Sequence, residues 1–553
     1  MDTLPAADFL DKNLHDFYAF LRGFVKLSDN VLLPNNSCIN FNVFIEELTK
    51  SFDDLKSKRD MHPELFGVET NEQAGKAKSL LDALYEEGIV PTYSFPKNVV
   101  STYIPDKKGN GKMAYEVDRG LDVAIGEYAP GRAIVVDKTT YQIGGLFYPG
   151  SERRRGQSLS PARAFIDDPN YLKPVLSCPN CGWFGLAEEG VRSCPFCGSA
   201  ALKENRSILR PWGFAPKNAE SIPDIQLEEE YSAVQQPLYS TLPDSDEMHP
   251  VKGYKHVRMA SRTNQRVIMV NNGPMDKGFM VCKDCGAAMP GDDGKVLDNV
   301  KRPYQTSFAR SKCNHTNVIN VNLGFDFITD MLVLEFAIDE QKIDMTQTGN
   351  PWLKRAAQSL AEALRLAISK KLDIEFTELV TGYRVRQNAT GAFVDVYLYD
   401  SLSSGAGYAI SVAEDIDSLL KETRCLLSEC DCTSACQKCL KHYRNQYIHG
   451  LLDRFAALEL LDWGQYGKIK APLSFSRQIE LSRPLYRILN SSGVLISASG
   501  ECIYASKGAN TKQIVVYPAM WAEPIESEHI FVSDDLIKNA KPYAVQKVMD
   551  GMQ

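Results

Sequence analysis

The densest cluster of reactive side chains in this sequence is the run CDCTSACQKC, which places four thiols within ten residues. Reduced thiols packed this closely are prone to oxidise unless a metal ion organises them. The run therefore predicts one structural metal site in a short loop, with Cys430, Cys432, Cys436 and Cys439 as its ligands. Cys425 lies five residues upstream of Cys430 and is an alternative to it, and spacing alone leaves that choice open.

The first cluster along the chain consists of two matched Cys-x-x-Cys-Gly motifs separated by twelve residues, at Cys178, Cys181, Cys194 and Cys197. Each motif forms a tight knuckle whose two thiolates point at one centre, and the glycine that follows permits the turn. Two knuckles complete the tetrahedral sulfur shell that structural zinc prefers. A redox pair is the rival interpretation, but redox motifs do not come as two matched knuckles. Since four thiolates leave no open position, we expect this site to be structural.

The second cluster along the chain combines one knuckle with a more distant thiol and imidazole, at Cys282, Cys285, Cys313 and His315. The segment between its halves contains MPGDDGK, which is typical of a hairpin tip. The pattern predicts a second zinc site of mixed ligands. The alternative is a knuckle completed by a different ligand, with His315 a surface residue.

The composition is that of a large soluble protein: 553 residues, 44% hydrophobic, with a net charge of −8 and fourteen cysteines. No window approaches the roughly eighteen uninterrupted apolar residues of a membrane span. The acidic start has no basic segment followed by an apolar run, so we expect a cytoplasmic protein without a secretory signal. Because the cytosol keeps thiols reduced, the clustered cysteines indicate about three zinc ions rather than disulfides. Cys38 and Cys502 stand alone and are expected to be ordinary buried thiols.

Helices and strands must position these sites, and the sequence pattern of the expected elements predicts a multidomain α+β chain with a C-terminal α/β layer domain. Within that domain we expect a helix over 352–372 and strands over 329–338, 376–385 and 392–400. The expected regions are a helical region at 1–90, a small β domain at 91–171, a zinc ribbon at 172–205, a β-rich region with the second zinc site at 206–315, the α/β domain with the four-cysteine zinc loop at 316–469, and a β-rich tail at 470–553.

Two features of the α/β domain admit a catalytic interpretation. The glycine turn SSGAGY, at 403–408, could bind a phosphate through its backbone N–H groups, although a tight turn between strand and helix is favoured. Clustered carboxylates could bind Mg²⁺ for a nuclease reaction, but without a lysine in a recognised pattern, solvated edges and caps are favoured. These carboxylates are Asp330, Glu335, Glu362, Glu378, Asp395 and Asp400. The sequence contains no G-x-x-x-x-G-K-[ST] loop, so we expect no ATP hydrolysis by this chain alone.

Nucleic-acid contact is predicted from three basic strips, of which the last two interleave aromatic residues with positive charge. A solvated strand face explains each strip equally well. The strips contain Arg153, Arg154 and Arg155; Lys252, Lys255, Arg258, Arg262 and Arg266; and Lys441 and Arg444.

Five segments together resemble a known family: TDMLVLEF, SLAEALRLA, VYLYDSLSSGAGYA, CDCTSACQKCL and RNQYIHGLLDRFAAL. They are similar to the MrfA-type zinc-binding domain, found at the C-terminal end of bacterial superfamily 2 DEAD/DEAH-box helicases and in the DISARM defence subunit DrmB. The resemblance implies a metal role for the four cysteines of the CDCTSACQKC run. Upstream, EGIVPTYSFP and IGEYAPGRAIVVDKTTYQIGGL resemble the segment that follows the second RecA-like lobe of these helicases, which extends the likeness to about residues 75–465.

What the resemblance implies is a non-catalytic, zinc-stabilised subunit that binds DNA and docks an ATPase partner carrying RecA-like lobes, in antiphage defence or DNA repair. No membrane partner is expected. The sequence lacks both RecA-like lobes, so it is expected to be either the C-terminal half of a split helicase or part of a longer chain. Two alternatives stay open: a metal-dependent nuclease and a DrmB-like protein–protein scaffold without DNA contact.

Overall fold

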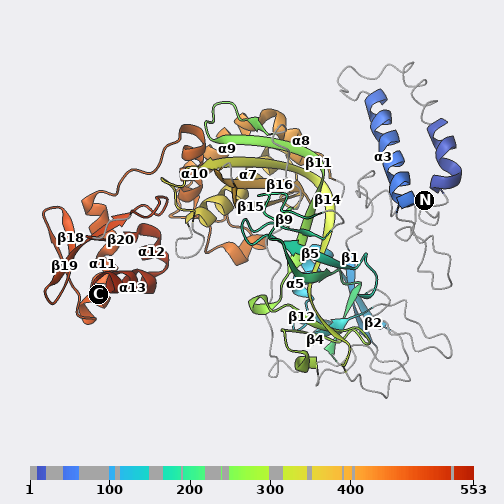
Figure 1. Cartoon of the computed structure of the whole chain (residues 1–553), viewed down its shortest axis with the longest axis horizontal. Helices are drawn as coiled ribbons and strands as arrows, with labels where there is room; N and C mark the ends of the chain where they lie inside the picture. The colour runs from blue at the N-terminus through green and yellow to red at the C-terminus, as the bar shows by residue number, and fades with distance from the viewer. Residues whose placement is uncertain are drawn as a thin grey trace.

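A computed structural model of the chain describes residues 9–19, 41–61, 99–105, 113–147, 166–187, 191–217, 238–239, 248–297, 315–345, 352–388, 391–401, 405–524 and 528–553. Three sheets organise these residues: an eleven-stranded sheet in the middle of the molecule, a five-stranded sheet beside it, and a four-stranded sheet near the C-terminus (Figure 1). The expected multidomain α+β fold is confirmed.

The central sheet is built around two long antiparallel strands, β11 (Val257–Asn271) and β14 (Val318–Ile338). The sequence of β14 is rich in branched and aromatic residues, and almost all of its residues from 321 onward are buried, as in strands covered on both faces. The other strands are β5 (Leu172–Ser177), β6 (Phe184–Leu186), β7 (Lys203–Leu209), β9 (Leu238–Tyr239), β10 (His249–Pro250), β12 (Phe279–Cys282), β13 (Ala288–Pro290), β15 (Leu379–Asn388) and β16 (Gly391–Asp400).

This one sheet joins strands from the expected ribbon, the expected β-rich region and the expected α/β domain. The sheet thus runs across the domain boundaries predicted at residues 205 and 315. Whether these regions fold as separate units stays a prediction. The pairing of β7 with β14 is parallel, whereas β5–β7 and β11–β14 are antiparallel.

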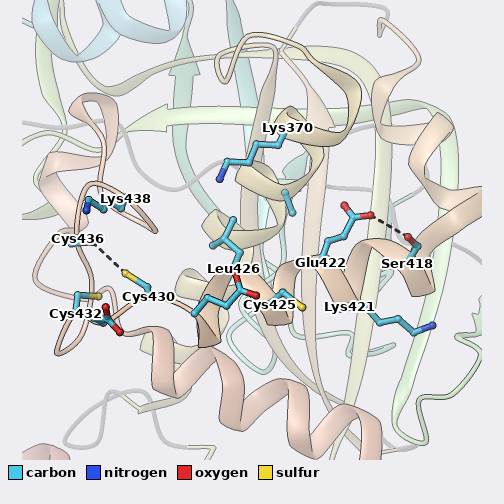
Figure 2. A pocket seen from close by; sticks show the side chains of 13 residues that line it. Lys370, Ser418, Lys421, Glu422, Cys425, Leu426, Cys430, Cys432, Cys436 and Lys438 are labelled. Carbon is cyan, nitrogen blue, oxygen red and sulfur yellow. Dashed lines mark hydrogen bonds between the residues drawn. The ribbon is translucent and has the colours of Figure 1, made fainter.

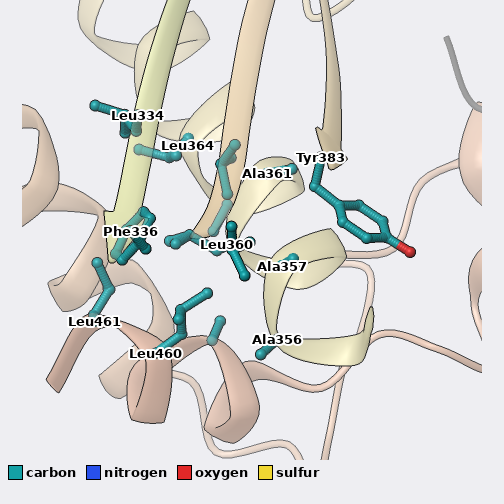
Figure 3. Close-up of a cluster of buried hydrophobic side chains, with 14 of the residues drawn as sticks. Leu334, Phe336, Ala356, Ala357, Leu360, Ala361, Leu364, Tyr383, Leu460 and Leu461 are labelled. Carbon is teal, nitrogen blue, oxygen red and sulfur yellow. The ribbon is translucent and has the colours of Figure 1, made fainter. Parts of the chain in front are cut away.

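Helices cover one face of the central sheet. The helix predicted over 352–372 is α7 (Trp352–Leu372), whose Leu360 and Leu364 lie against Leu334 and Phe336 of β14 (Figure 3). Leucines of α10 (Arg454–Tyr466) close the same core. Burying each such side chain stabilises the fold by about 1.5–3 kcal/mol. The other described helical segments between β11 and α10, which together with the central sheet we call the central unit, are η6 (Pro274–Asp276), η7 (Gly294–Leu297), α8 (Tyr408–Ser411), η8 (Val412–Asp415), α9 (Ile416–Ser428) and η9 (Tyr443–Ile448).

The five-stranded sheet has the order β2-β1-β8-β4-β3, with α5 (Leu121–Glu127) packed beside it. Four of its strands follow each other in sequence: β1 (Val99–Pro105), β2 (Met113–Gly120), β3 (Ala133–Val136) and β4 (Thr139–Leu146). The fifth, β8 (Gly213–Pro216), enters from beyond the first cysteine cluster and pairs with both β1 and β4. In the N-terminal region the structure describes η1 (Phe9–Asn13) and α3 (Phe41–Met61).

The C-terminal unit has its own core and lies at one end of the molecule (Figure 1). Its sheet contains β17 (Leu495–Ser499), β18 (Cys502–Lys507), β19 (Asn510–Tyr517) and β20 (His529–Ser533). Helices α12 (Asp534–Asn539) and α13 (Lys541–Gly551) follow, and α11 (Phe475–Ser491) precedes the sheet. The sequence analysis missed α11, a helix that contains Pro484. Among the described helices, none combines the length and apolar character needed to cross a bilayer.

Candidate metal centres and nucleic-acid contacts

The three Cys-x-x-Cys-Gly knuckles share one backbone geometry. In each, the glycine N–H donates to the carbonyl of the first cysteine at 2.8 to 2.9 Å. The three glycines have positive φ values of 72° at Gly182, 72° at Gly198 and 74° at Gly286. An L-residue is strained in this left-handed region, which explains why glycine follows each pair.

The first cluster brings together Cys178 and Cys181, from the loop between β5 and β6, and Cys194 and Cys197, from the segment between β6 and β7. All four sulfur atoms lie within 4.8 Å of one another, and the pairs Cys178–Cys197 and Cys181–Cys194 are each 3.5 Å apart. A tetrahedral zinc ion with Zn–S bonds of about 2.3 Å requires sulfur atoms about 3.8 Å apart, so the donors fit. The cluster packs among buried residues that include Trp183 and Phe196.

The CDCTSACQKC run also forms a four-sulfur group, with separations of 3.5 Å for Cys430–Cys436, 3.7 Å for Cys432–Cys439 and 3.8 Å for Cys436–Cys439. Cys430 belongs to this group and Cys425 does not, which favours Cys430 as the predicted ligand. The backbone N–H of Lys438 lowers the pKa of Cys436 to about 7, whereas burial raises the pKa of Cys439 to about 12. A bound cation would hold both as thiolates.

An open cavity of about 860 Å³ adjoins this loop, and Cys430, Cys432 and Cys436 line one part of it (Figure 2). Its lining mixes lysines with carboxylates, namely Lys370, Lys421 and Lys438 with Glu422, Glu429 and Asp431.

The remaining cluster joins Cys282, Cys285 and His315, whose ligating atoms lie within 4.8 Å of one another. Two thiolates and one imidazole suit zinc and leave one tetrahedral position for a fourth ligand. The fourth predicted ligand, Cys313, lies outside the described residues, so its role stays a prediction.

Side chains outside the cysteine run hold the CDCTSACQKC loop and the segment after it against the helices, and of these the sequence analysis named only Glu362, as a carboxylate. The buried Arg454 donates from Nε to the carbonyl of Cys432 at 2.9 Å and from Nη1 to that of Leu427 at 2.8 Å. On the other side, Glu362 of α7 bonds His442 at 2.9 Å and Asn445 at 3.1 Å. These residues carried no spacing signal of their own, because they meet only through the fold.

The carboxylates proposed for a nuclease are not gathered in one site among the described residues. Glu335 and Asp395 both bond the guanidinium of Arg386 in the sheet. Glu362 faces His442 instead, and Glu378 precedes β15. Salt bridges and caps thus occupy most of the set, and no open group of carboxylates suited to Mg²⁺ is seen in the described part of the chain.

Asp400 and Asp330 lie at the glycine turn. The carboxylate of Asp400 accepts the backbone N–H groups of Ala406, Tyr408 and Ala409 at 2.5 to 3.1 Å. These are the N–H groups that a phosphate would need, so the turn is closed by the protein's own anion. Burial, with the charge of Asp400 beside it, raises the pKa of Asp330 to about 6.

The basic strip predicted along β11 is divided by the fold. A β-bulge between Arg262 and Gln265 shifts the register, so Arg258 and Arg262 face one side of the sheet and Arg266 the other. Arg258 lies 3.5 Å from Glu335, and Arg266 lies 3.6 Å from Asp326.

The other predicted nucleic-acid contacts are scattered. Lys252 and Lys255 are exposed on the turn before β11, and Lys441 is half-buried after the CDCTSACQKC loop. Arg153, Arg154 and Arg155, and the side chain of Arg444, lie outside the described part of the structure. All of these contacts stay predictions.

Comparison with known proteins gives one curated relative and a group of solved structures. The chain is 30% identical over 509 residues to the Druantia protein DruE of Escherichia coli (strain UMEA 4076-1), covering 85% of this chain and 27% of that protein. The chain thus spans about a quarter of the length of this relative. The DUF1998 helicase MrfA bound to DNA is 11% identical with a TM-score of 0.34, covering 74% of this chain and 39% of that one. A further structure of the DUF1998 helicase MrfA is also 11% identical, with a TM-score of 0.24, covering 70% of this chain and 46% of that one.

The family comparison falls on the helix and loop that carry the CDCTSACQKC run. Residues 360–440 match the MrfA Zn-binding domain, and this range includes all four cysteines of the run and most of α7. The three cysteine-rich groups agree with zinc as the cofactor. Residues 360–440 of this chain are therefore similar to the MrfA Zn-binding domain.

Proposed function

We propose that this chain is the zinc-stabilised, DNA-contacting part of a helicase-type protein in bacterial antiphage defence or DNA repair. It would not hydrolyse ATP by itself, and a partner or segment with RecA-like lobes would supply the motor. The observation that carries the proposal is the match of residues 360–440 to the MrfA Zn-binding domain, with four sulfur atoms grouped within that range. The relationship to DruE supports a place in the same broad class of proteins.

The geometry supports a platform rather than a catalyst. The candidate ligands of the two four-cysteine centres leave no open coordination position, and the glycine turn is closed by Asp400. The regions expected from the sequence, from the helical segment at 1–90 to the tail at 470–553, are proposed as the units of this platform. The three centres connect its sheet strands and loops, so zinc supplies folding energy instead of chemistry.

The test measures ATP hydrolysis and DNA binding by the purified, zinc-loaded chain. We expect no ATP hydrolysis without a partner, and DNA affinity that falls steeply as salt rises, because phosphate contacts release counterions. ATP hydrolysis by the chain alone would overturn the motor-docking role. Absence of DNA binding at low salt would favour the scaffold alternative, and DNA cleavage with Mg²⁺ would favour the nuclease.

A further inference from the structure

We propose that Trp212 and Tyr171 form a stacking platform for the bases of a single-stranded nucleic acid, beside a cationic cluster that receives its phosphates. This inference rests on the proposed function and deepens it, because it names the surface and the form of nucleic acid that it takes.

The two rings are held together by the backbone at the end of β7. Trp212 lies in the turn between β7 and β8, and Tyr171 immediately precedes β5. Their ring centroids are 5.3 Å apart at 46°, and the backbone N–H of Arg210 donates to the carbonyl of Tyr171 at 2.8 Å. Trp212 is 37% exposed, which is high for the largest apolar side chain. An exposed indole held against a second ring offers a surface on which a base can stack.

Positive charge gathers next to these rings around a single carboxylate. Asp326 of β14 lies 2.5 Å from Lys173 and 3.6 Å from Arg266. Although burial raises the pKa of Asp326, the charges of Lys173, Arg266 and Arg210 outweigh it and hold that pKa below its usual value. Three cations thus gather around this one carboxylate. The side chains of Lys173 and Arg266 are 32% and 28% exposed, so a phosphate can reach them.

Some of the same residues also line a small pocket on this sheet. Tyr171, Lys173, Arg210 and Asp326 line one cavity between β5, β7 and β14. The bulge in β11 places Arg266 on this face, away from Arg258 and Arg262. The basic strip predicted along β11 therefore does not form one surface. The charged patch instead combines side chains on or next to β5, β7, β11 and β14.

The first cysteine cluster fixes the spacing of this patch. It lies between β5, which carries Lys173, and β7, which leads to Arg210 and Trp212. A metal ion bound there would hold the two strands in register.

A single strand suits this surface better than a duplex or an acidic polypeptide. Bases in a duplex are stacked on each other and are not accessible to a protein ring, whereas bases of a single strand are. An acidic polypeptide would use the cations but leave the rings without a stacking partner.

The experiment measures binding of a fluorescein-labelled oligodeoxythymidine of about 12 nucleotides, within the site size of such platforms, to the full zinc-loaded chain. We expect Trp212→Ala to weaken binding by about 5- to 100-fold and Trp212→Phe to retain most of it. The matched control is Tyr543→Ala, which removes a 72% exposed ring from α13 in the C-terminal unit and should leave binding unchanged.

Charge and stacking are separated by two further arms. Lys173→Gln should reduce the slope of log K against log salt by about 0.7, whereas Trp212→Ala should leave that slope unchanged. An abasic strand of equal length should bind the native chain as weakly as the normal strand binds Trp212→Ala. The same measurements with an RNA strand show whether DNA or RNA binds more tightly. Trp212→Ala must weaken binding of whichever strand binds the native chain more tightly.

Equal binding of the abasic and normal strands, or native affinity of Trp212→Ala, would overturn the stacking platform while the proposed function stands. No binding of any strand by the native chain would instead overturn the DNA contact itself. Should Trp212→Ala fail to fold, photocrosslinking of a 5-iodouracil strand to the native chain decides. An adduct at Tyr171 or Trp212 supports the platform, and adducts only elsewhere reject it.

Discussion

At the scale of single residues, the most informative groups are carboxylates buried in the sheet. Arg386 bonds both Glu335 and Asp395, and each of the three side chains is at most 6% exposed. On the same face, the guanidinium of Arg384 lies 4.4 Å from the ring centroid of Phe196, beside the first cysteine cluster. The ionic network and that cluster are thus packed as one layer, with charges that depend on each other for compensation.

We expect Arg386→Ala to destabilise this layer by about 3–5 kcal/mol, because it leaves two buried carboxylates without their shared cation. Hydrogen exchange of β15 and β16 peptides measures the effect locally. The control is Arg386→Ala combined with Glu335→Gln and Asp395→Asn, which removes the uncompensated charges. Exchange as slow in the single variant as in the native chain would show that Arg258 alone compensates for them.

Asp330 gives a pH dependence with a defined sign. Its pKa in the folded chain is about 6, raised by burial and by Asp400, against about 3.9 when unfolded. The folded state therefore binds the proton more tightly, so stability falls as pH rises from about 4 to about 6 and stays lower above that.

Replacing Asp330 by Asn, which cannot ionise, should remove this fall. The free energy of unfolding of Asp330→Asn minus that of the native chain should rise by about 2 kcal/mol from pH 4.5 to 7.5. Hydrogen exchange of β14 peptides at both pH values measures it, and comparison with the native chain cancels any common loss of metal in acid. Asp54→Asn, at an exposed site in α3, is the control. A difference independent of pH would contradict the assignment.

At the scale of elements, the knuckles show how one glycine conformation determines a metal loop. Gly182 has a φ of 72°, and a Cβ added to it would have no atom within 4 Å, so a side chain there meets strain without a clash. The cost of an L-residue in this conformation is about 1–2 kcal/mol.

Gly182→Ala should therefore release zinc from the first centre about 5- to 30-fold more readily, as measured by competition with a chromophoric chelator. Gly182→Asn should lose less, because Asn tolerates the left-handed region better. Gly450→Ala is the matched control, since that glycine also has open space but no positive φ. Equal zinc retention in all variants would mean that the turn does not depend on its glycine.

At the scale of the whole molecule, the C-terminal unit is attached to the central unit by a few specific contacts. Arg355 of α7 lies 3.2 Å from Asp535 of α12, and both side chains are nearly buried. Trp521 pairs with Ile343 in an isolated bridge and donates from its indole to the carbonyl of Lys470 at 2.9 Å. The unit has its own core, so these contacts orient it rather than fold it.

We expect Arg355→Ala to loosen this attachment while both cores stay folded, because Asp535 loses the cation that offsets its burial. Limited proteolysis should then cut between α10 and α11 at least several-fold faster, with zinc content unchanged. Lys354→Ala is the neighbouring control on an exposed position of the same helix. An unchanged cleavage rate would mean that the Trp521 contacts suffice.

The sequence by itself determined the local features. The cysteine groups, the limits of α7 and the glycine turn follow from spacing and periodicity, since a knuckle or an amphipathic helix is specified within a few residues. Only the tertiary structure decided which distant groups meet. It groups Cys430, and not Cys425, with the other three thiols, and it brings Arg454 to the CDCTSACQKC loop. It also places Arg266 on the opposite face of β11 from Arg258 and Arg262. A single bulge moves every later side chain to the opposite face, and strand pairing across more than a hundred residues leaves no periodic signal.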